Sequence, residues 1–370
     1  MDLLERLTAI TPKRILALDG GGIRGVLSLG FLERIENLLR VRHQNEELRL
    51  CDYFDLIGGT STGAIIAGAL AIGMEVAEIK RSYLELGGKI FGRKLWRPWR
   101  AFFDVKALEG ELARLFGDRT LDDPSIRTGL CIVTKRADTG STWPLINHPN
   151  GKYFSLNRTM LLRNVIRAST AAPMFFVPAK HQVGRSGGYG AFVDGGVSMS
   201  NNPALLLFLI ATLKGFPFRW AIGEERLLLV SVGTGNWERA QDVSVVANRR
   251  LWDWAREVPT MLIQDANSQN QLILQYLSNS KTAWQIDDEV GDLSSDLISA
   301  EPALAYLRYD VRLDSESLRD LGLSELAARA KSLWAMSAAE NRYDLAAIGQ
   351  KAADRQVPEE HFPKCFDILG

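Results

Sequence analysis

Short apolar runs alternate with longer segments of helical periodicity along the first two thirds of the chain. The strand-like runs are Ile15 to Leu18, Phe54 to Ile57, Leu130 to Thr134, Phe192 to Val193 and Arg226 to Val232. The helix-like stretches are Val26 to Leu39, Thr62 to Leu70, Val76 to Leu86, Thr159 to Ala168 and Ala204 to Leu213. Apolar strands separated by helices are typical of a parallel sheet that is buried on both faces. The pattern predicts an α/β fold with a mostly parallel sheet covered by helices on both faces.

Long helical patterns predominate after residue 240, where the glycine content falls. They are Trp252 to Tyr276, Leu318 to Lys331 and Ala338 to Ala353. Between them, Tyr306 to Leu313 is expected to add a strand. The chain shows no repeat, low-complexity linker or block of like charges. We therefore expect residues 10–240 to form an α/β core and residues 241–370 to form a mainly helical part packed on the same domain.

A Gly-x-Ser-x-Gly pentapeptide, Gly59 to Gly63, separates the second strand from the helix that follows it. A serine on a sharp strand-to-helix turn has its hydroxyl lifted clear of the sheet, and the flanking glycines remove side chains that would block a substrate carbonyl. Ser61 is therefore a candidate nucleophile. Because Gly, Ser and Thr are common in loops, the pentapeptide alone also fits an ordinary turn.

Three consecutive glycines, Gly20 to Gly22, lie between the first strand and the first helix. Backbone N–H groups in such a loop can stabilise a phosphate, or the oxyanion that forms when a carbonyl is attacked. Together with Gly25, the loop also satisfies the G-x-G-x-x-G dinucleotide fingerprint. That fingerprint expects an acidic residue at the end of the next strand, whereas Glu46 and Glu47 lie in a polar stretch. We therefore favour the oxyanion interpretation.

A third glycine turn carries an aspartate, because Phe192 to Gly196 delivers Asp194 from a short apolar strand onto two glycines. Asp194 fits two roles: a turn residue, which is usual for Asp-Gly, or the base that takes the proton from Ser61. Of the four histidines, only His361 follows Asp194, as a Ser, Asp, His triad would require. It lies in a proline-flanked terminal segment, so we favour a direct dyad of Ser61 and Asp194.

These segments together resemble the patatin-like phospholipase family. Its motifs correspond to the D-G-G-G-x-R-G loop from Asp19 to Gly25, the elbow from Gly59 to Gly63 and the D-G-G turn from Asp194 to Gly196, in the family's order. The stretch from Ala168 to Pro173 resembles its fourth block. The motifs cover roughly the first two thirds of the chain, and beyond about Gly235 the resemblance rests on helical character.

The resemblance implies a three-layer α/β/α fold and lipid acyl hydrolase activity of the phospholipase A type, with no metal or organic cofactor. It implies Ser61 as the nucleophile, Asp194 as the base, and the N–H groups of Gly20, Gly21 and Gly22 as the oxyanion hole. The residues with supporting roles are Arg24, Gly59, Gly63, Gly195 and Gly196. The α/β core would then be the catalytic part.

The basicity of Asp194 is the difficult step of such a mechanism. A free aspartate has a pKa of about 3.9, against about 6.5 for histidine. We therefore expect burial to raise the pKa of Asp194 toward the operating pH. Arg24 has two interpretations: it attracts an anionic head group, or it braces the glycine loop by hydrogen bonds to carbonyls. We favour bracing, because Arg24 lies at a helix start.

Composition sets outer limits on the function. The chain has 370 residues, 46% hydrophobic and 24% charged, which is typical of a globular protein with an ample core. Lys+Arg and Asp+Glu both number 44, so no global charge attracts a nucleic acid polymer. The cysteines Cys51, Cys131 and Cys365 lack metal-ligand spacing and indicate reduced thiols in a cytoplasmic protein. The N-terminus lacks the features of a signal peptide, and the longest apolar runs are about half a membrane span.

Cations and aromatic rings gather between Lys89 and Phe103, a segment with five of each and no acidic residue. This mixture suits an anionic membrane interface, where rings lie at headgroup depth and cations meet phosphates. The alternative is that the rings are core and the cations are solvated. The candidate membrane-contact residues are Arg93, Lys94, Trp96, Arg97, Trp99 and Arg100. With docking, the protein would be cytoplasmic and peripheral at the inner face of the membrane.

Three functions from different classes follow from these residues. The leading one is a lipid acyl hydrolase that cleaves fatty-acyl esters of membrane glycerophospholipids. The second is a dinucleotide-binding oxidoreductase that uses Gly20, Gly22 and Gly25. The third is a non-catalytic regulatory protein on a hydrolase scaffold.

Control of the activity is expected, because a phospholipase left active inside a cell would damage the cell's own membranes. We expect control by a small-molecule ligand, by assembly into a homo-oligomer or by occlusion. Some bacterial patatin-like proteins of similar size are membrane-degrading effectors in antiphage defence that cyclic nucleotides activate. The resemblance allows that role here, although no residue in the sequence marks a nucleotide pocket.

Overall fold

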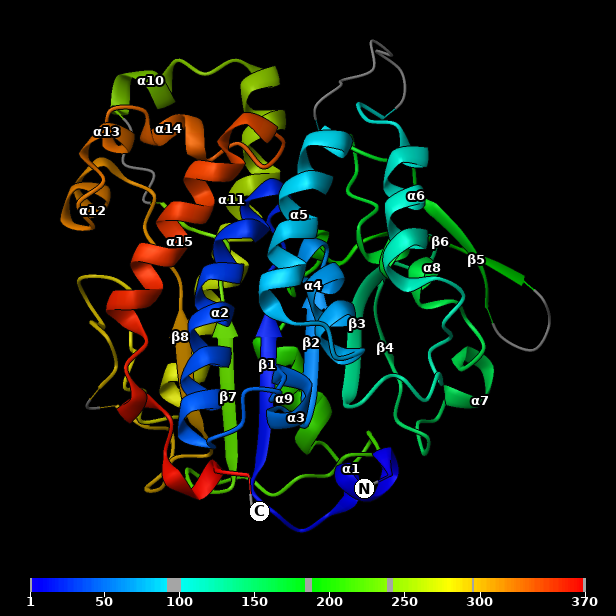
Figure 1. The fold of residues 1–370 in the computed structure, drawn as a ribbon. Helices are drawn as coiled ribbons and strands as arrows, with labels where there is room; N and C mark the ends of the chain where they lie inside the picture. The colour runs from blue at the N-terminus through cyan, green and yellow to red at the C-terminus, as the bar shows by residue number, and fades with distance from the viewer. Residues whose placement is uncertain (1, 92–100, 184–187, 238–241, 295, 369–370) are drawn as a thin grey trace.

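One mixed sheet organises the molecule (Figure 1). The computed structural model describes residues 2–91, 101–183, 188–237, 242–294 and 296–368. Within these residues the strand order is β5-β6-β3-β2-β1-β7-β8, and β4 pairs with β3 outside this path. The strands are β1 (Lys13–Leu18), β2 (Leu56–Thr60), β3 (Gly129–Arg136), β4 (Ser141–Ile146), β5 (Ala179–Val183), β6 (Gly188–Asp194), β7 (Leu227–Val232) and β8 (Ala305–Tyr309). The strands β1, β2, β3, β7 and β8 pair in parallel, whereas β4, β5 and β6 attach by antiparallel pairing.

Helices follow most of the parallel strands. They are α1 (Leu3–Thr8), α2 (Gly25–Arg42), α3 (Leu50–Tyr53), α4 (Thr62–Ala71), α5 (Val76–Phe91), α6 (Val105–Phe116), α7 (Phe154–Asn157), α8 (Leu162–Ser169), α9 (Ala204–Thr212), α10 (Val243–Ala247), α11 (Leu251–Tyr276), α12 (Ser315–Asp320), α13 (Ser324–Ala327), α14 (Ala330–Leu333) and α15 (Arg342–Gln356). Short 3-10 turns are η1 (Gly22–Arg24), η2 (Gly195–Val197), η3 (Ala339–Asn341), η4 (Glu359–His361) and η5 (Lys364–Phe366).

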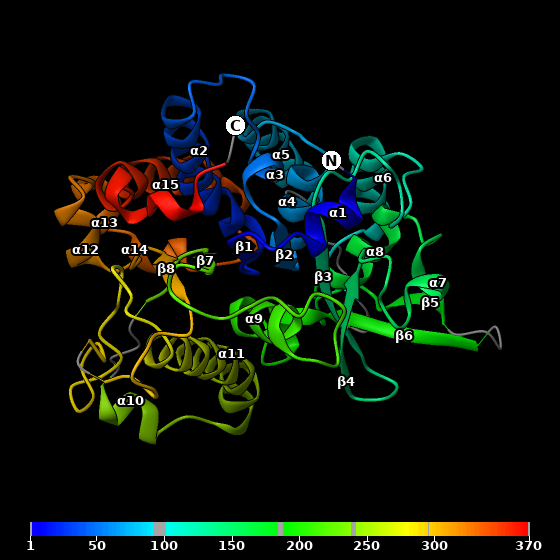
Figure 2. The same cartoon turned by 90° about the horizontal axis from the view of Figure 1, so that it is seen from below.

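The sheet is buried on both faces, because successive side chains of a strand point to opposite sides. On β1, Leu16 and Leu18 join the larger core with α2, α4 and α5, whereas Ile15 and Ala17 join the smaller core with α9. Figure 2 shows these layers from below, with α2, α4, α5 and α15 on one side of the strands and α9 and α11 on the other. The predicted α/β fold with a mostly parallel, doubly covered sheet is confirmed.

The C-terminal part adds both to the sheet and to a helical layer. The strand expected near Tyr306 is β8, which pairs in parallel with β7. Helix α15 crosses α2 at glycines: a Cβ on Gly30 would lie 2.4 Å from the backbone of Gly349. The single helix expected from Leu318 to Lys331 was wrong. Three short helices replace it, and Gly322, with a φ of 75°, follows the first of them.

The parallel strands point toward one end of the molecule, the upper end in Figure 1. The segments that leave β1, β2 and β7 at this end begin at Asp19, Ser61 and Gly233, and the first two belong to the glycine motifs. Ligands of open α/β sheets bind at the carboxyl ends of the strands, so this end is where a site is expected.

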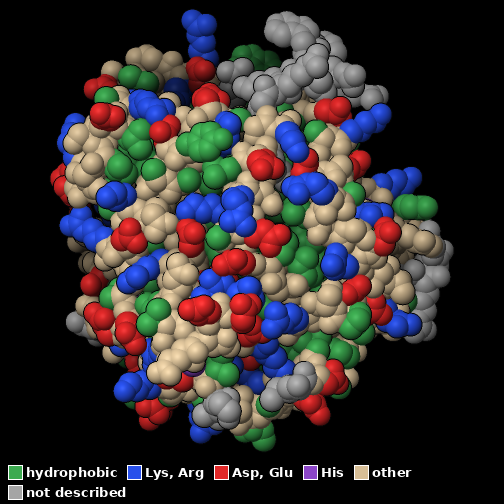
Figure 3. All heavy atoms as spheres, in the orientation of Figure 1, with side chains coloured by type: hydrophobic (Ala, Val, Ile, Leu, Met, Phe, Trp, Pro, Cys, Tyr) green, Lys and Arg blue, Asp and Glu red, His purple; other side chains and the backbone are tan. Residues whose placement is uncertain are grey.

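Two observations bear on how the protein could meet a membrane. Throughout the part of the chain that the structure describes, no helix has both the length and the apolar character needed to cross a bilayer. On the face shown in Figure 3, Lys and Arg side chains are interspersed with Asp and Glu. The predicted contact residues Arg93, Lys94, Trp96, Arg97, Trp99 and Arg100 lie outside the described residues, so their docking role stays a prediction.

Candidate active site

Ser61 occupies the tight turn between β2 and α4. Its backbone has φ 56° and ψ −121°, outside the regions that residues with a Cβ normally adopt. Strain of this kind at a strand-to-helix junction is typical of a nucleophile elbow, which presents the serine hydroxyl. Gly63 lets the turn sit against the end of β1, because a Cβ there would lie 2.3 Å from the carbonyl oxygen of Leu18. The turn leaves Ser61 partly exposed.

Asp194 lies within hydrogen-bond distance of Ser61, although the two are 133 residues apart in the chain. Asp194 ends β6 and is paired with Thr134 of β3, the strand next to β2. The Ser61 hydroxyl donates a hydrogen bond of 2.5 Å to Asp194 Oδ2, and the Gly196 amide donates one of 2.7 Å to Asp194 Oδ1. The two motifs predicted to converge do so.

Burial raises the pKa of Asp194 to about 6, while the hydrogen bonds from Ser61 and Gly196 act in the opposite direction. The residue is only 4% exposed, so its charged form is poorly solvated. A base with a pKa near 6 is suited to accept the serine proton close to neutral pH. The direction of this shift agrees with the one that the chemistry requires.

No histidine hydrogen-bonds to Ser61 or Asp194 in the described residues. His361, the only histidine that follows Asp194, pairs instead with the hydroxyl of Tyr309, at 3.0 Å from its Nδ1. The geometry therefore supports the dyad over a triad.

Two hydroxyl side chains hold the elbow in place. Ser169 accepts a hydrogen bond of 2.9 Å from the Ser61 amide and donates one of 2.6 Å to the carbonyl oxygen of Val133. The Thr60 hydroxyl donates to the carbonyl oxygen of Ser200 at 2.6 Å. Sequence reasoning missed both roles. Ser169 lies in the block from Ala168 to Pro173, which was a usable signal. Thr60 lies in the pentapeptide, but nothing in the sequence marked Ser200 as its partner.

The glycine loop passes directly beside the elbow. A Cβ on Gly20 would lie 3.2 Å from the Cβ of Ser61. The Gly21 amide donates to Thr62 Oγ1 at 3.2 Å, and the Gly22 amide has no hydrogen-bond partner within the described residues. Gly22 has a φ of 61°, which favours glycine at this position. The Gly22 amide is the unengaged candidate oxyanion donor. The Gly21 amide is the second candidate, because its partner is a side-chain hydroxyl that can rotate away, unlike a backbone carbonyl.

Gly20 differs from the prediction. Its amide donates to the carbonyl oxygen of Asn201 at 3.0 Å and is therefore already engaged. The reason is that the loop after η2 runs alongside the glycine loop, and the Asn201 side chain also donates to the carbonyl oxygen of Gly20 at 3.4 Å. Gly20 thus permits the close approach of the loop to Ser61 rather than supplying an oxyanion donor.

Comparison with known proteins identifies the family. Residues 16–208 match the family described as "Patatin-like phospholipase". The chain belongs to this family. It is a lipid acyl hydrolase, and a serine nucleophile is typical of such enzymes.

Several named relatives align over much of this patatin-like phospholipase. A protein of Escherichia coli (strain TW11681), named cGAMP-activated phospholipase, is 26% identical over 345 residues, which cover 89% of this chain and 90% of that protein. Patatin-like protein 4 of Arabidopsis thaliana is 25% identical over 338 residues, covering 83% of this chain and 82% of the relative. Among solved structures, VipD from Legionella pneumophila covers 88% of this chain and 67% of its own at 14% identity, with a TM-score of only 0.37.

Arg24 braces the glycine loop of this patatin-like phospholipase. The side chain is 5% exposed, and its guanidinium donates to the carbonyl oxygens of Gly235 at 3.2 Å and of Gly21 at 3.5 Å. It also stacks 4.7 Å from the ring centre of Trp237. The contacts match the bracing interpretation, because a buried guanidinium that is bound to carbonyls does not reach a head group.

A buried ion-pair network, the Arg308 cluster (Asp19, Arg308 and Asp310), anchors the first residue of the same loop. Arg308, on β8, binds both carboxylate oxygens of Asp19, at 3.0 and 2.8 Å. It also donates to Asp310 Oδ2 at 2.8 Å, while Asp310 Oδ1 accepts from the Gly235 amide at 2.7 Å. Sequence reasoning missed Arg308 and Asp310, because nothing near them in the sequence signals a partner 289 residues away.

The pH dependence of hydrolysis follows from Asp194. Below a pH of about 6 this carboxyl is protonated and does not accept the Ser61 proton. We expect kcat/KM for a soluble ester to fall about tenfold per pH unit below pH 6 and to level off above it. A pH–rate profile with p-nitrophenyl butyrate, with tryptophan fluorescence as a check on folding, measures this. A flat profile down to pH 4 would contradict Asp194 as the base.

Proposed function

We propose that this chain is a phospholipase A-type esterase that cleaves fatty-acyl esters of membrane glycerophospholipids. The observation that carries the proposal is the 2.5 Å hydrogen bond between a strained, partly exposed serine and a buried carboxylate. Ser61 Oγ attacks the ester carbonyl carbon while Asp194 takes the hydroxyl proton, which then passes to the departing lysophospholipid oxygen. Water repeats the cycle on the acyl-enzyme, releasing the fatty acid and restoring Ser61.

The glycine loop stabilises the charge that develops during this reaction. In the tetrahedral intermediate the carbonyl oxygen becomes an oxyanion, and we assign its donors to the amides of Gly21 and Gly22. Loss of one such donor typically raises the barrier by about 2.7–4 kcal/mol. The close packing of Gly20 against Ser61 supports this assignment, because it brings the glycine loop beside the nucleophile.

The two alternative functions have less support. The dinucleotide interpretation needs bare amides on Gly20 and Gly22, yet the Gly20 amide binds Asn201. The non-catalytic interpretation leaves unexplained why Asp194 is buried, raised in pKa and bonded to the hydroxyl of Ser61. Membership of a hydrolase family is consistent with both arguments.

Regulation by a cyclic nucleotide is part of the proposal. It is supported by the E. coli relative named cGAMP-activated phospholipase, which aligns over 89% of this chain. A phospholipase that remains off until a nucleotide signal arrives would fit a membrane-degrading effector in antiphage defence. We propose residues 10–240 as its catalytic core and residues 241–370 as the mainly helical part packed on it.

An exposed apolar stripe suggests how the enzyme meets a membrane. On the first half of α11, Leu251, Val258 and Leu262 are 81, 42 and 62% exposed, and they recur at the spacing of one helix face. Trp252, next to them, is 77% exposed, and Val243 of α10 is 82% exposed. Figure 1 places α10 and the start of α11 at the end toward which the parallel strands point. We propose this α10–α11 surface as a bilayer contact at the end of the molecule where β2 delivers Ser61.

Fatty-acid release from vesicles tests this function and its surface together. Wild-type protein with cyclic GMP–AMP should release fatty acid from phosphatidylglycerol vesicles. The double variant Trp252→Glu/Leu262→Glu should release it about tenfold more slowly or worse, because two apolar anchors are lost from the interface. Hydrolysis of soluble p-nitrophenyl butyrate should not change, and Tyr153→Glu, at a residue that is 52% exposed, serves as the control.

Two outcomes are decisive here. If wild-type protein with cyclic GMP–AMP releases no fatty acid from the vesicles, the phospholipase proposal is wrong. If the double variant and the wild type release fatty acid at equal rates, the α10–α11 surface does not dock on the bilayer, and the esterase proposal still stands.

A further inference from the structure

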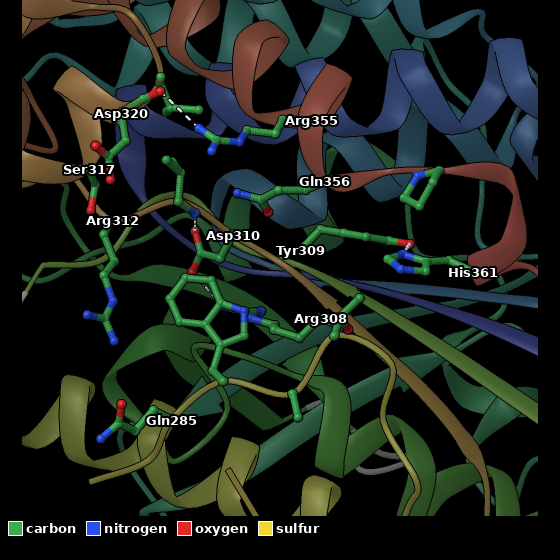
Figure 4. A pocket seen from close by; sticks show the side chains of 16 residues that line it. Gln285, Arg308, Tyr309, Asp310, Arg312, Ser317, Asp320, Arg355, Gln356 and His361 are labelled. Atoms are coloured by element: carbon green, nitrogen blue, oxygen red, sulfur yellow. Dashed lines mark hydrogen bonds and ion pairs between the residues drawn. The ribbon is translucent and has the colours of Figure 1, made fainter. Parts of the chain in front are cut away.

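A cavity of about 660 Å³ lies beside β8, away from Ser61 and Asp194. We name it the β8 cavity, and its walls come from four segments: residues 282–285, the end of β8 with the residues that follow it, α12 with Leu321, and the end of α15 with Pro358 and His361. Its volume is in the range of small-molecule sites. In Figure 4, Arg312 and Gln285 lie on one side, Arg355 and Gln356 extend from α15 on another, and Arg308 and Asp310 lie between them.

Hydrogen bonds fix the wall segment that carries Trp284. Gln275 of α11, which is 1% exposed, accepts a hydrogen bond from the Trp284 amide at 3.0 Å and donates one to its carbonyl at 2.9 Å. Thr282 Oγ1 accepts from the Arg308 amide at 2.7 Å, which fastens the segment to the edge of β8. The half-buried indole of Trp284 is thereby fixed at the cavity.

The groups that face the cavity suit an anionic ring compound. The guanidinium of Arg312 lies 5.8 Å from the ring centre of Trp284, so an aromatic face and a cation occur together. Within the described residues Arg355 donates to a backbone carbonyl, that of Asp320, at 2.9 Å and forms no ion pair. Guanidinium forks bind phosphate oxygens, an indole face stacks on a base, and the amide of Gln356 can bond a base edge. The Gln285 amide already donates to Asp287 and Asp288.

The acidic groups of the cavity are accounted for within its walls or lie at its rim. Asp310 is bound to Arg308 and to the amides of Gly235 and Val311. Asp320 is exposed on α12. Arg308 Nε is buried and has no partner within the described residues, whereas the other nitrogens of this guanidinium are bound to Asp19, Ser231 and Asp310.

The cavity and the glycine loop share this wall. Arg308 and Asp310 line the cavity and also hold Asp19 and the Gly235 amide, which lie at the start of the glycine loop and at the turn that Arg24 braces. A ligand that contacts Arg308 therefore lies one side chain away from the loop that carries the oxyanion donors. A ligand changes a conformational equilibrium only through contacts that differ between the two states. The shared wall is where contacts of a ligand would meet the contacts that hold the glycine loop.

We propose that the β8 cavity binds a cyclic dinucleotide, which acts on the oxyanion loop through the Arg308 cluster. The inference rests on the proposed function, because the ligand would control the lipid hydrolase assigned to Ser61. The base stacks on Trp284, and the phosphodiesters bind Arg312 and Arg355. Asp19 then transmits the occupancy of the cavity to Gly21 and Gly22.

Calorimetric titration with cyclic GMP–AMP tests the site directly. Wild-type protein should bind one molecule of cyclic GMP–AMP per chain. ATP and inorganic phosphate should bind with at least about 100-fold lower affinity. Trp284→Ala should raise the dissociation constant of cyclic GMP–AMP by about tenfold or more, in the range measured for loss of a stacked base. Arg312→Gln and Arg355→Gln should each weaken it by a similar factor. Tyr153→Ala, which removes an exposed ring near α7 on the other side of the molecule in Figure 1, should bind like the wild type.

The activation curve provides the second readout. For wild-type protein, cyclic GMP–AMP should raise ester hydrolysis, and Trp284→Ala should shift the half-maximal concentration upward in step with its dissociation constant. Ser61→Ala should bind cyclic GMP–AMP like the wild type while hydrolysing nothing, which separates failure of the site from failure of the proposed enzyme. Unchanged binding by Trp284→Ala and both arginine variants would overturn the proposal, as would equal affinity for ATP.

Discussion

Replacement of Ser61 by alanine is expected to lower kcat for ester hydrolysis by about 10⁴-fold or more. The variant lacks the atom that forms the acyl-enzyme, and neither Asp194 nor the glycine amides can substitute for it. Losses of this size are typical when a serine nucleophile is removed from an enzyme that keeps its oxyanion donors. Single-turnover release of p-nitrophenol from p-nitrophenyl butyrate, with cyclic GMP–AMP present, measures the effect.

The Ser61→Ala variant should remain folded, which makes the kinetic result interpretable. Alanine and serine meet the same difficulty at a φ of 56°, so the backbone strain of the elbow is unchanged. A fluorophosphonate probe should label wild-type protein at Ser61 and leave the variant unlabelled. Asp194→Asn keeps the shape of the partner and removes the base, so it should also be slow. Equal labelling of wild type and Ser61→Ala would eliminate Ser61 as the nucleophile.

The parallel half of the sheet was readable from the sequence because its strands are buried on both faces. Such strands appear as uninterrupted apolar runs, as β1 and β7 do. The strands β4 and β5 were missed for the opposite reason: β4 begins with two exposed residues and contains Pro144, and β5 alternates with exposed Lys180 and Gln182. Their place in the sheet depends on antiparallel partners, which local periodicity does not reveal.

The candidate site shows the same division between local features that the sequence reveals and long-range contacts that it does not. Ser61, Asp194 and the glycine loop belong to short motifs whose chemistry depends on adjacent residues, so the sequence displays them. The engaged state of the Gly20 amide depends on Asn201, which lies 181 residues away. Long-range pairings of this kind are set by how the strands are ordered, and the order of β6 and β3 was not evident from either segment alone.

Replacement of Arg308 by methionine is expected to lower the free energy of unfolding by about 3–5 kcal/mol. Burial alone would lower the pKa of Arg308, but Asp19 and Asp310 outweigh it, and the net shift is upward. The side chain is 4% exposed, so its removal leaves two buried carboxylates without their cation. Urea unfolding at pH 8 measures the loss. Arg319→Met, at an exposed position on α12, should change stability by less than about 0.5 kcal/mol.

The pH dependence of this loss distinguishes uncompensated charge from lost packing. Burial raises the pKa of Asp19 to about 6 even with Arg308 present, and without the arginine that pKa should rise further. An acid whose folded-state pKa exceeds its unfolded value of about 3.9 is stabilising when protonated, and that contribution is lost as the pH rises through the folded-state pKa. The penalty of Arg308→Met should therefore be smaller at pH 5 than at pH 8, and the further change Asp19→Asn should recover part of it at pH 8. A penalty that is the same at both pH values, and that Asp19→Asn does not reduce, would mean that Arg308 acts by filling space and that its charge does not anchor the glycine loop.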